Sequence, residues 1–403
     1  MIGASTPVSE QLVLSAWTQK TMPSALQHML SATAHPDIIS FALGLPAPEL
    51  FPAEAFGAIS AEVLRQDVAA LQYGPPSESL KASIVALMAL RGVECRAEQI
   101  FLTNGAQQGM NMLARLLLDP GGSVLIEDCI YTGFQQVLEP FQPTILTVPA
   151  DVASGMDVDA VAAHLESGKR PAFIYAITDG HNPLGVSMSA EKRAQLVALA
   201  RDYRVPIIED DAYGFLSYAQ QSIPPLRALS EDWVFYVGSF SKILAPALRV
   251  GWVIVPEWLI DKLSIVKEAS DIGTATFSQR LVAAYVNTQA LPAHLARLRH
   301  EYAVRRDAML DALEHCFPAT TRWYKPDNGM FIWIELPETV NSLELLRIAI
   351  TDQKVAFIPG TVFSVGERQS ASNGLRLNFS NCNVARIQTG IERLAATIKA
   401  LPQ

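Results

Sequence analysis

A lysine between two apolar runs is the residue of this sequence best suited to covalent chemistry. Lys242 lies after the apolar, β-branched and aromatic run 233–237 and before a second run, 250–255. Runs of this kind are typical of buried strands. A loop between two core strands is a poor place for a solvated ammonium, because partial desolvation lowers its pKa. The neutral amine is then available as a nucleophile toward aldehydes.

Two hydroxyls and a planar cation lie close to this lysine in the sequence. Ser239 and Ser241 precede Lys242, and Arg249 follows it by seven residues. Hydroxyl donors and a guanidinium are the groups that bind a phosphate monoester. The segment therefore combines a reactive amine with a candidate phosphate site.

The whole segment 238–252, with its Ser-x-Ser-Lys, Arg and Gly-Trp, resembles the cofactor-lysine segment of fold-type I aminotransferases that use pyridoxal 5'-phosphate. More narrowly, the chain resembles the branch of 2-aminoadipate and kynurenine aminotransferases and the aminotransferase-like half of some bacterial regulators. The resemblance implies that Lys242 forms a Schiff base with this cofactor. It also implies that Ser239, Ser241 and Arg249 bind the cofactor's phosphate.

A second phosphate anchor is predicted where a strand turns into a helix. The apolar run 100–103 is followed by Gly105, Ala106 and Gln107 and then by a helical pattern, 110–118. Such a turn offers unpaired backbone N–H groups and the positive end of a helix dipole to an anion. The turn resembles the family's G-S-Q-Q motif with Ala106 where a serine is common. The backbone donors of Ala106 and Gln107 therefore remain, and one hydroxyl contact is missing.

Three acidic residues, Glu209, Asp210 and Asp211, end the apolar strand that begins at residue 205. They repel one another unless something compensates their charge, and a protonated pyridine nitrogen does so for one of them. By its match to the family's E-D-D-x-Y motif, Asp210 is implied to contact that nitrogen and keep the ring cationic, as an electron sink. Tyr213 is implied to contact the phenolic oxygen, and Glu209 and Asp211 are expected to be structural.

The resemblance also assigns residues around the ring and the substrate. Tyr131 is implied to stack on the pyridine ring. Asn182, held by the rigid turn at Pro183, is implied to donate to the phenolic oxygen. Arg376, in a strand that matches the family's R-L-x-F-S motif, is implied to bind the substrate α-carboxylate, because a guanidinium binds a carboxylate bidentately.

Two further motifs concern the N-terminal part of the chain. The Pro- and Gly-rich stretch 40–52 is predicted to be a loop, and it resembles the family's arm at the active-site mouth, where Gly44 gives the substrate backbone access. Tyr73 matches the tyrosine that in relatives reaches the phosphate of the neighbouring subunit, which implies at least a homodimer. The residues after it, 77–81, depart from the family pattern, and an ordinary packed tyrosine is the alternative.

The alternation of strands and helices over 100–255 favours an α/β fold with a mostly parallel, helix-covered sheet and ligand groups at the strand ends. A long helical pattern follows over 258–314, and a possible amphipathic helix lies at 11–30. The resemblance implies the fold of type I pyridoxal phosphate transferases, with a smaller α+β domain. The expected organisation is an N-terminal arm at 1–45, a large cofactor-binding domain at 46–290 and a small domain at 291–403. In the small domain the patterns predict strands over 329–335, 355–360 and 375–380 and a helix over 342–353.

Composition narrows the class of protein further. A net charge of −9 and a pI near 5.3 argue against nucleic acid or an anionic membrane as the main partner. No apolar run reaches the roughly 18 residues of a membrane span, and the N-terminus lacks the pattern of an export signal. Four scattered cysteines fit reduced thiols in a cytoplasm. The histidines form no metal-binding pattern, so no metal is expected.

The leading hypothesis is an aminotransferase that moves an amino group between an L-amino acid and a 2-oxo acid by a ping-pong mechanism. The freed amine of Lys242 moves the proton of the substrate Cα. Elimination or replacement, cyclisation or oxidase chemistry is the alternative, because Thr178, Asp179 and His181 depart from the family's usual turn. A lesser alternative is the effector-binding domain of a regulator, although only about 40 residues precede Phe41 and none of them reads as a helix-turn-helix. The preference for a substrate side chain cannot be read from these residues.

Overall fold

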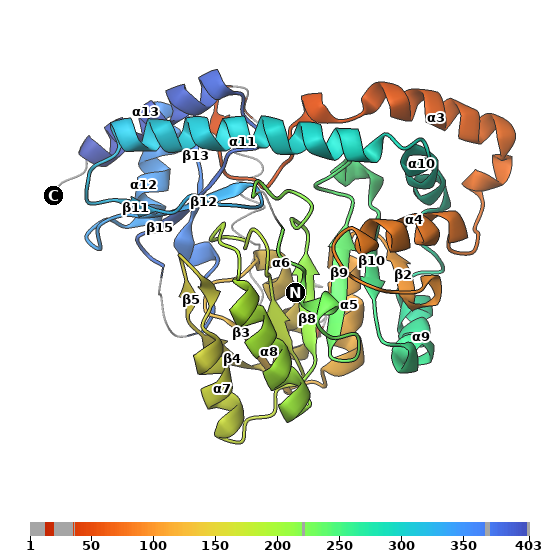
Figure 1. Cartoon of the computed structure of the whole chain (residues 1–403). Helices are drawn as coiled ribbons and strands as arrows, with labels where there is room; N and C mark the ends of the chain where they lie inside the picture. Colours follow the sequence, from red (N-terminus) through yellow and green to blue (C-terminus); the bar gives the residue numbers. More distant parts are fainter. Residues whose placement is uncertain (1–12, 20–34, 36, 220–221, 367–370, 401–403) are drawn as a thin grey trace, which may run out of the picture.

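The structure, a computed structural model, describes residues 13–19, 35, 37–219, 222–366 and 371–400 of the chain (Figure 1). The helix predicted over 11–30 lies largely outside these residues, and residues 16–19 of it form a turn. Among the described residues, no helix is long and apolar enough to cross a membrane.

A seven-stranded sheet forms the centre of the molecule (Figure 1). Five neighbouring strands run parallel, and β10 is antiparallel to both of its neighbours, so the predicted mostly parallel sheet is confirmed. Residues of β8, β9 and β10 are buried throughout, as expected for apolar strands that are covered on both faces. In spatial order the strands are β2 (Ile100–Thr103), β10 (Gly251–Ile254), β9 (Val234–Ser239), β8 (Ile207–Asp211), β7 (Ile174–Ala176), β3 (Ser123–Glu127) and β4 (Thr144–Val148).

Helices cover both faces of this sheet and enclose two apolar cores. One core packs Leu113, Phe134 and Leu263 of three helices against Val237 and Val253 of the sheet. The other packs two helices against the opposite face. The first set is α5 (Ala106–Leu117), α6 (Thr132–Leu138) and α9 (Ile260–Ser270), and the second is α7 (Val158–Glu166) and α8 (Ala190–Tyr203).

The long helical pattern predicted over 258–314 is three helices. These are α9, α10 (Thr276–Asn287) and the 26-residue α11 (Leu291–Cys316). The breaks contain Gly273 and also Gln289, whose φ of 62° does not continue a helix. In Figure 1, α11 spans from the neighbourhood of α10 to the C-terminal part of the chain.

A second, antiparallel sheet of four strands is built from the C-terminal part of the chain. Its strands lie in the order β11 (Arg322–Trp323), β12 (Phe331–Glu335), β15 (Gly374–Asn378) and β14 (Ile358–Pro359). The helices α11, α12 (Ser342–Ile348) and α13 (Val384–Ala400) share a buried core with this sheet. The helix predicted over 342–353 ends earlier, at Ile348, and a π-helical turn follows it.

The single strand predicted over 355–360 is wrong, because two short strands take its place. β13 (Val355–Ala356) pairs in parallel with β1 (Ile39–Ser40), whereas β14 pairs with β15. Phe41 continues this join, since its N–H donates to Ala356 O over 2.8 Å and its carbonyl accepts from Asn378 N over 2.8 Å. The segment before Gly44 is thereby attached to the C-terminal sheet and leads Gly44 toward the central sheet.

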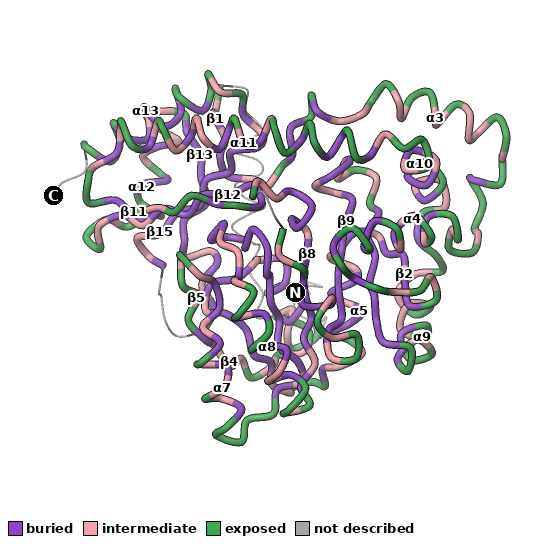
Figure 2. The backbone as a smooth tube through the Cα atoms, in the orientation of Figure 1, coloured by how far each residue is buried: buried purple, intermediate pink, exposed green. Residues whose placement is uncertain are grey.

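The remaining elements lie at the periphery. Figure 2 shows burial concentrated in the two sheets, while the outer turns of the helices are exposed. Helix α3 contains no buried residue at all. The peripheral elements are α3 (Ala53–Gln66), α4 (Glu78–Ala89) and a small hairpin of β5 (Ala150–Asp151) and β6 (Gly155–Met156).

Candidate active site

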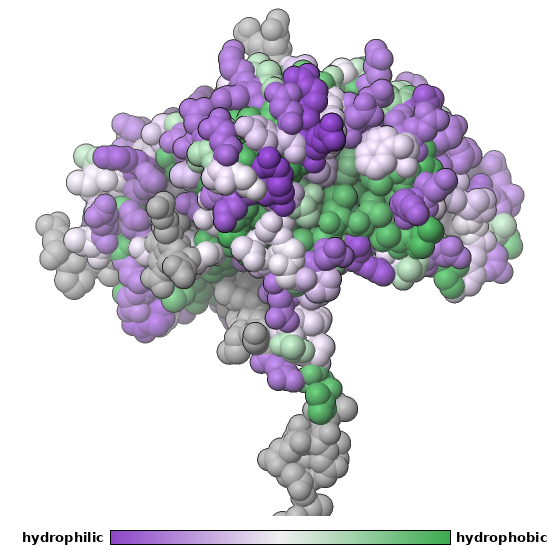
Figure 3. Space-filling view, turned by 90° about the horizontal axis from the view of Figure 1, so that it is seen from below, coloured by the Kyte–Doolittle hydropathy of each residue, from purple (hydrophilic) through white to green (hydrophobic). Residues whose placement is uncertain are grey.

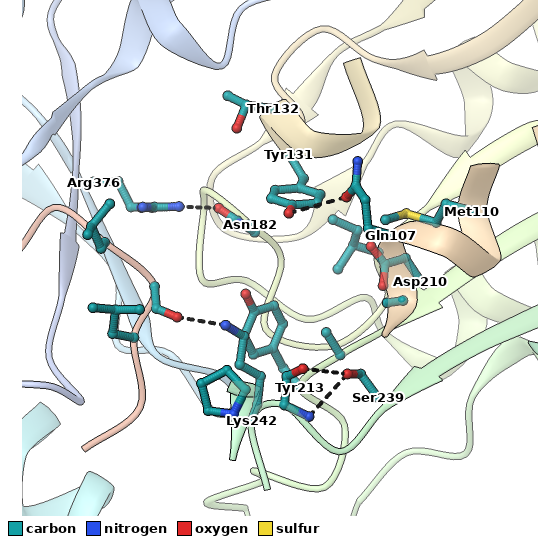
Figure 4. A pocket seen from close by; sticks show the side chains of 18 of the residues that line it. Gln107, Met110, Tyr131, Thr132, Asn182, Asp210, Tyr213, Ser239, Lys242 and Arg376 are labelled. Carbon is teal, nitrogen blue, oxygen red and sulfur yellow. Dashed lines mark hydrogen bonds between the residues drawn. The ribbon is translucent and has the colours of Figure 1, made fainter. Parts of the chain in front are cut away.

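A cavity of about 320 Å³ lies at the carboxyl ends of the parallel strands, bordered by the segment around Gly44 and by the C-terminal sheet (Figure 4). Open α/β sheets bind ligands at this edge. All the predicted site residues except Tyr73 line this one cavity. They are Gly44, Ala106, Gln107, Tyr131, Asn182, Asp210, Tyr213, Ser239, Ser241, Lys242, Arg249 and Arg376.

Lys242 reaches into the cavity from the loop that follows β9. Its Nζ donates a hydrogen bond to Gly44 O over 2.7 Å. Burial lowers the pKa of Lys242 to about 8, and the charges of Arg376 and Arg249 act in the same direction. The predicted loss of proton affinity is therefore confirmed, and a sizeable fraction of the amine is neutral near physiological pH.

Asp210 faces the cavity from the end of β8, between two carboxylates that point to the other face of the sheet, as alternation along a strand requires. Its Oδ2 accepts a hydrogen bond from the hydroxyl of Tyr175 over 2.8 Å. Its Oδ1 is buried and has no partner among the described residues. Burial raises the pKa of Asp210 to about 6, although the hydrogen bond from Tyr175 acts in the opposite direction. One oxygen of this carboxylate is thus available to a ligand in the cavity.

The two neighbouring carboxylates are satisfied by the protein. Glu209 accepts hydrogen bonds from Leu226 N and Arg227 N, at 2.7 and 2.9 Å, and from Thr178 Oγ1 at 2.8 Å. Asp211 accepts from Gly214 N at 2.7 Å and from the Tyr236 hydroxyl at 2.8 Å, and it pairs with Arg91 at 3.1 Å. Neither of them lines the cavity.

The other end of the cavity is suited to an anion. Helix α5 begins at Ala106, after Gly105 with a φ of +79°, so the first backbone N–H groups of the helix face this end. Arg249 lies against the same turn, and its Nη2 donates to Asn104 O over 2.8 Å. A Cβ on Gly105 would lie only 2.5 Å from Arg249 Nη2, so the glycine makes room for the guanidinium. The hydroxyl of Ser239, 3.0 Å from that of Ser241, adds further donors.

Aromatic and amide side chains lie between these two ends. Tyr131, the residue before α6, has its ring over Gly133, where a Cβ would lie 2.4 Å from Tyr131 Cζ. Asn182 makes a side-chain hydrogen bond with Tyr213, and the ring of Tyr213 packs edge-on against Phe331. In Figure 4, Tyr131 lies on the side of the cavity that holds Gln107, with its hydroxyl 3.5 Å from Gln107 Oε1.

Arg376 enters the cavity from β15 of the C-terminal sheet. Its Nη1 donates to Asn182 Oδ1 over 2.6 Å, and its Nη2 donates to Ala42 O over 2.5 Å. Its Nε has no partner among the described residues. The guanidinium lies between the rings of Phe331 and Phe363, at 4.2 and 4.9 Å from their centroids. Burial lowers the pKa of Arg376 to about 10, so the side chain stays cationic at neutral pH and can bind a carboxylate.

The residues of the unusual turn have structural partners outside the cavity. Asp179 pairs with Arg91 at 2.8 Å and with Arg193 at 2.7 Å. His181 Nε2 lies 2.9 Å from Glu127 Oε2, with both side chains almost fully buried. Thr178 donates to Glu209, as described above. Neither Thr178, Asp179 nor His181 lines the cavity, so their departure from the family's usual turn is accommodated by the core.

Several functional positions were missed from the sequence. Tyr175, which contacts Asp210, lies in an apolar strand and looks like any core residue. Phe363 follows the turn at Pro359 and Gly360, and that turn was the only signal for it. Other lining residues that the sequence did not predict are Leu43, Leu45, Met110, Thr132, Ile177, Ala212, Pro246 and Ile358. Tyr73 lies outside the cavity of its own chain, and 76% of its surface is exposed.

Comparison with known proteins decides the family. The family model described as aminotransferase class I and II matches residues 51–394. The chain belongs to the class I and II aminotransferases. It is therefore an enzyme that transfers an amino group between an amino acid and a 2-oxo acid, with pyridoxal 5'-phosphate as its cofactor.

Relatives of this aminotransferase cover it almost end to end. It is 37% identical to aromatic-amino-acid aminotransferase 1 of Thermococcus litoralis, over 93% of this chain and 91% of that one. A solved kynurenine aminotransferase of Pyrococcus horikoshii, in complex with PMP, is 34% identical, with a TM-score of 0.91 and coverage of 97% and 98%. The α-aminoadipate aminotransferase LysN of Thermus thermophilus, complexed with N-(5'-phosphopyridoxyl)-L-leucine, is 32% identical, with a TM-score of 0.89 and coverage of 98% of each chain. These likenesses confirm the predicted fold and branch.

The side chains that line the cavity of this aminotransferase match the chemical groups of the cofactor. An unpaired carboxylate oxygen of Asp210 suits a protonated ring nitrogen, and the start of α5 with Arg249 suits a phosphate. The amine of Lys242 lies in the same cavity. No cluster of three or more His, Cys, Asp or Glu side chains that could bind a metal occurs in the described parts of the chain.

Proposed function

We propose that this aminotransferase works by two half-reactions in the cavity around Lys242, with Lys242, Asp210 and Tyr213 as its catalytic residues. The observation that carries the proposal is a single cavity that holds an amine of lowered pKa, an unpaired buried carboxylate oxygen and a helix N-terminus. The cofactor supplies an aldehyde that accepts the amino group and a cationic ring that stabilises negative charge at the substrate Cα. The protein supplies binding, orientation and proton transfer.

The binding roles follow from the chemistry of each side chain. Asp210 Oδ1 would accept a hydrogen bond from the protonated ring nitrogen, and the negative charge of the carboxylate favours the protonated ring. Tyr213 and the amide nitrogen of Asn182 contact the phenolic oxygen, because Asn182 Oδ1 is already taken by Arg376. Tyr131 stacks on the ring. The phosphate is bound by the backbone N–H groups of Ala106 and Gln107, the hydroxyls of Ser239 and Ser241, and Arg249.

Lys242 has two tasks in this proposal. Its amine would hold the cofactor through the aldehyde group, and the amine of the substrate would displace it. The Lys242 amine, whose pKa burial lowers to about 8, would then accept the proton of the substrate Cα and donate it again, since a general base works best with a pKa near the working pH. Arg376 binds the α-carboxylate, and the backbone at Gly44 borders the substrate. The two half-reactions alternate, which gives ping-pong kinetics.

The expected assembly is a homodimer with shared active sites. Tyr73 is largely exposed and lies outside its own cavity, which supports a contact with the phosphate of the neighbouring subunit. We also propose an arm at 1–45, a large domain at 46–290 and a small domain at 291–403, and a location in the cytoplasm. The pairing of β1 with β13 supports an arm that belongs with the small domain.

The substrate side chain is expected to be uncharged. Leu43, Leu45, Ile358 and Phe363 line the cavity, and Phe363 lies against the guanidinium of Arg376. The relatives named above are an aromatic-amino-acid, a kynurenine and an α-aminoadipate aminotransferase. The apolar lining supports the first of these classes.

An absorbance screen tests both the reaction and the substrate class. The purified holoprotein is mixed with single amino acids in the absence of any 2-oxo acid. We expect loss of the visible cofactor band and one equivalent of 2-oxo product per site, most readily with aromatic and large apolar amino acids. Continued turnover without a 2-oxo acid, or release of ammonia, would instead indicate elimination or oxidase chemistry.

A further inference from the structure

We propose that Tyr175 is a positioning residue that holds the carboxylate of Asp210 in the orientation and the ionised state that the cofactor's ring nitrogen requires. The inference rests on the proposed placement of that nitrogen beside Asp210. It concerns the group behind the carboxylate, which the cofactor itself does not contact.

The hydroxyl of Tyr175 is held firmly in place. It comes from β7, the strand next to β8 in the sheet, and donates to Asp210 Oδ2 over 2.8 Å. The ring of Tyr175 stacks on Phe134 of α6, with centroids 3.6 Å apart and planes 5° apart. Phe134 packs edge-on against Phe173 in turn. Both Tyr175 and Phe134 are completely buried, so the hydroxyl cannot turn away from Asp210.

This hydrogen bond decides which oxygen of Asp210 serves the ligand. Because Oδ2 is occupied by Tyr175, the unpaired Oδ1 is the oxygen that remains for a proton-bearing nitrogen. The carboxylate therefore has one fixed orientation before any ligand arrives, and no reorganisation is needed on binding.

The same hydrogen bond favours the ionised carboxylate. Asp210 is only 5% exposed, and a buried carboxylate without donors tends to take up a proton. The negative charge of Asp211 also favours the protonated form of Asp210, whereas Lys242 and His181 favour the ionised form. Donation from Tyr175 stabilises the charged form directly. Without it, the proton shared between Asp210 and the ring nitrogen would move toward the carboxyl group, and the ring would lose its positive charge.

The structure contains a matched control for this role. Tyr236 lies on β9, on the other side of β8, and its hydroxyl donates to Asp211 Oδ2 over the same 2.8 Å. It is as completely buried as Tyr175. Asp211 does not line the cavity and is paired with Arg91. Tyr236→Phe therefore removes an equivalent buried hydrogen bond without touching the proposed nitrogen site.

The test compares two ligands that differ only at the ring nitrogen. Dissociation constants of the cofactor-free protein are measured for pyridoxal 5'-phosphate and for its deaza analogue, in which carbon replaces that nitrogen. Wild-type protein is expected to prefer the natural cofactor. In Tyr175→Phe this preference falls roughly tenfold, the scale of one hydrogen bond to a charged group. In Tyr236→Phe the preference stays at the wild-type value, even if both dissociation constants rise together.

Three results would overturn the inference. A wild-type preference in Tyr175→Phe would show that the hydroxyl serves packing alone. An equal fall in Tyr236→Phe would show a general effect of losing a core hydrogen bond. If wild-type protein bound the two ligands equally well, the ring nitrogen would not lie at Asp210, and the proposed cofactor site would be wrong as well. If Tyr175→Phe does not fold, Phe134→Leu frees the tyrosine ring but keeps its hydroxyl, and it should lower the preference in the same direction; an unchanged preference there would contradict the role.

Discussion

The chemistry proposed for this enzyme depends first on single side chains whose proton affinity is set by burial. Lys242 loses affinity for its proton because it is buried and lies near Arg376 and Arg249. Asp210 gains affinity because it is buried with a carboxylate neighbour. The two groups thus approach each other in pKa inside one cavity, which is a common feature of catalytic sites.

The lowered pKa of Lys242 predicts how the cofactor-free protein reacts with aldehydes. The neutral amine is the nucleophile, so the rate of reaction with pyridoxal should rise with pH, with its midpoint at the lowered pKa of about 8, and then level off. Pyridoxal lacks the phosphate, so the rate reports on the amine and not on phosphate binding. Stopped-flow absorbance at several pH values measures the midpoint.

Arg249→Met should move this midpoint upward, because one of the cations that lower the pKa of Lys242 is removed. Arg115→Met is the control, since Arg115 is exposed and donates to Ser270. A midpoint near the ordinary lysine value in wild-type protein would refute the proposed environment.

Among the elements, the turn between β2 and α5 forms the proposed anion site because Gly105 has no side chain and so leaves room for Arg249. Gly105 has a φ of 79° and a ψ of 171°, a backbone conformation essentially restricted to glycine, and it lies against the guanidinium of Arg249. Gly121 also has a positive φ, of +75°, but open space where its Cβ would be. Gly121→Ala therefore measures the cost of a side chain at a positive φ without displacement of Arg249.

Gly105→Ala is predicted to lower both stability and cofactor affinity. An alanine at the positive φ of Gly121 costs about 1 kcal/mol, so Gly121→Ala should show that loss alone in chemical denaturation, and Gly105→Ala should lose more. Gly105→Ala should in addition bind pyridoxal 5'-phosphate roughly tenfold more weakly, because the contact of Arg249 with the phosphate is lost. Equal cofactor affinity in the two variants would contradict the proposed phosphate site.

Elements with strong local patterns could be predicted from the sequence, and elements set by distant partners could not. The strand over the apolar run 233–237 could be predicted because its pattern is local, and β9 confirms it. Helix α8 begins after Ser189, whose hydroxyl accepts from Lys192 N. The strand predicted over 355–360 divides because its two halves pair with different segments, β1 and β15. No local pattern records those partners.

The same distinction holds for the site. Its residues lie in motifs such as Ser-x-Ser-Lys, which depend on chemistry that only certain side chains provide. By contrast, the hydrogen bond of Tyr175 to Asp210 joins residues far apart in the sequence. So do the ion pairs of Arg91 with Asp179 and Asp211. An apolar run does not reveal which of its tyrosines donates to a carboxylate.

The proposed homodimer needs an interface, and exposed apolar side chains offer a candidate surface for it. The face in Figure 3 carries a patch of apolar side chains within a polar margin. Among the described residues, Val68, Leu71, Tyr73, Ile265 and Ile272 are each more than half exposed. Large exposed apolar side chains of this kind are typical of interfaces.

Mixed dimers test whether Tyr73 acts across the interface. Lys242→Ala and Tyr73→Ala are each expected to be poorly active alone. If Tyr73 serves the partner's site, a mixed dimer contains one site with both residues intact, so co-expression should restore activity. The amount restored is measured on mixed dimers isolated with two affinity tags. Activity no higher than that of Tyr73→Ala would place Tyr73 within its own site or outside both.

The proposed Schiff base between Lys242 and the cofactor can be trapped chemically. Borohydride is added to the holoprotein, so that the cofactor becomes permanently fixed to the amine that holds it, and the digested protein is then mapped by mass spectrometry. The added mass is expected on Lys242 and is expected to be absent from Lys242→Ala. A label on another lysine, or a native protein that takes up no cofactor, would contradict it.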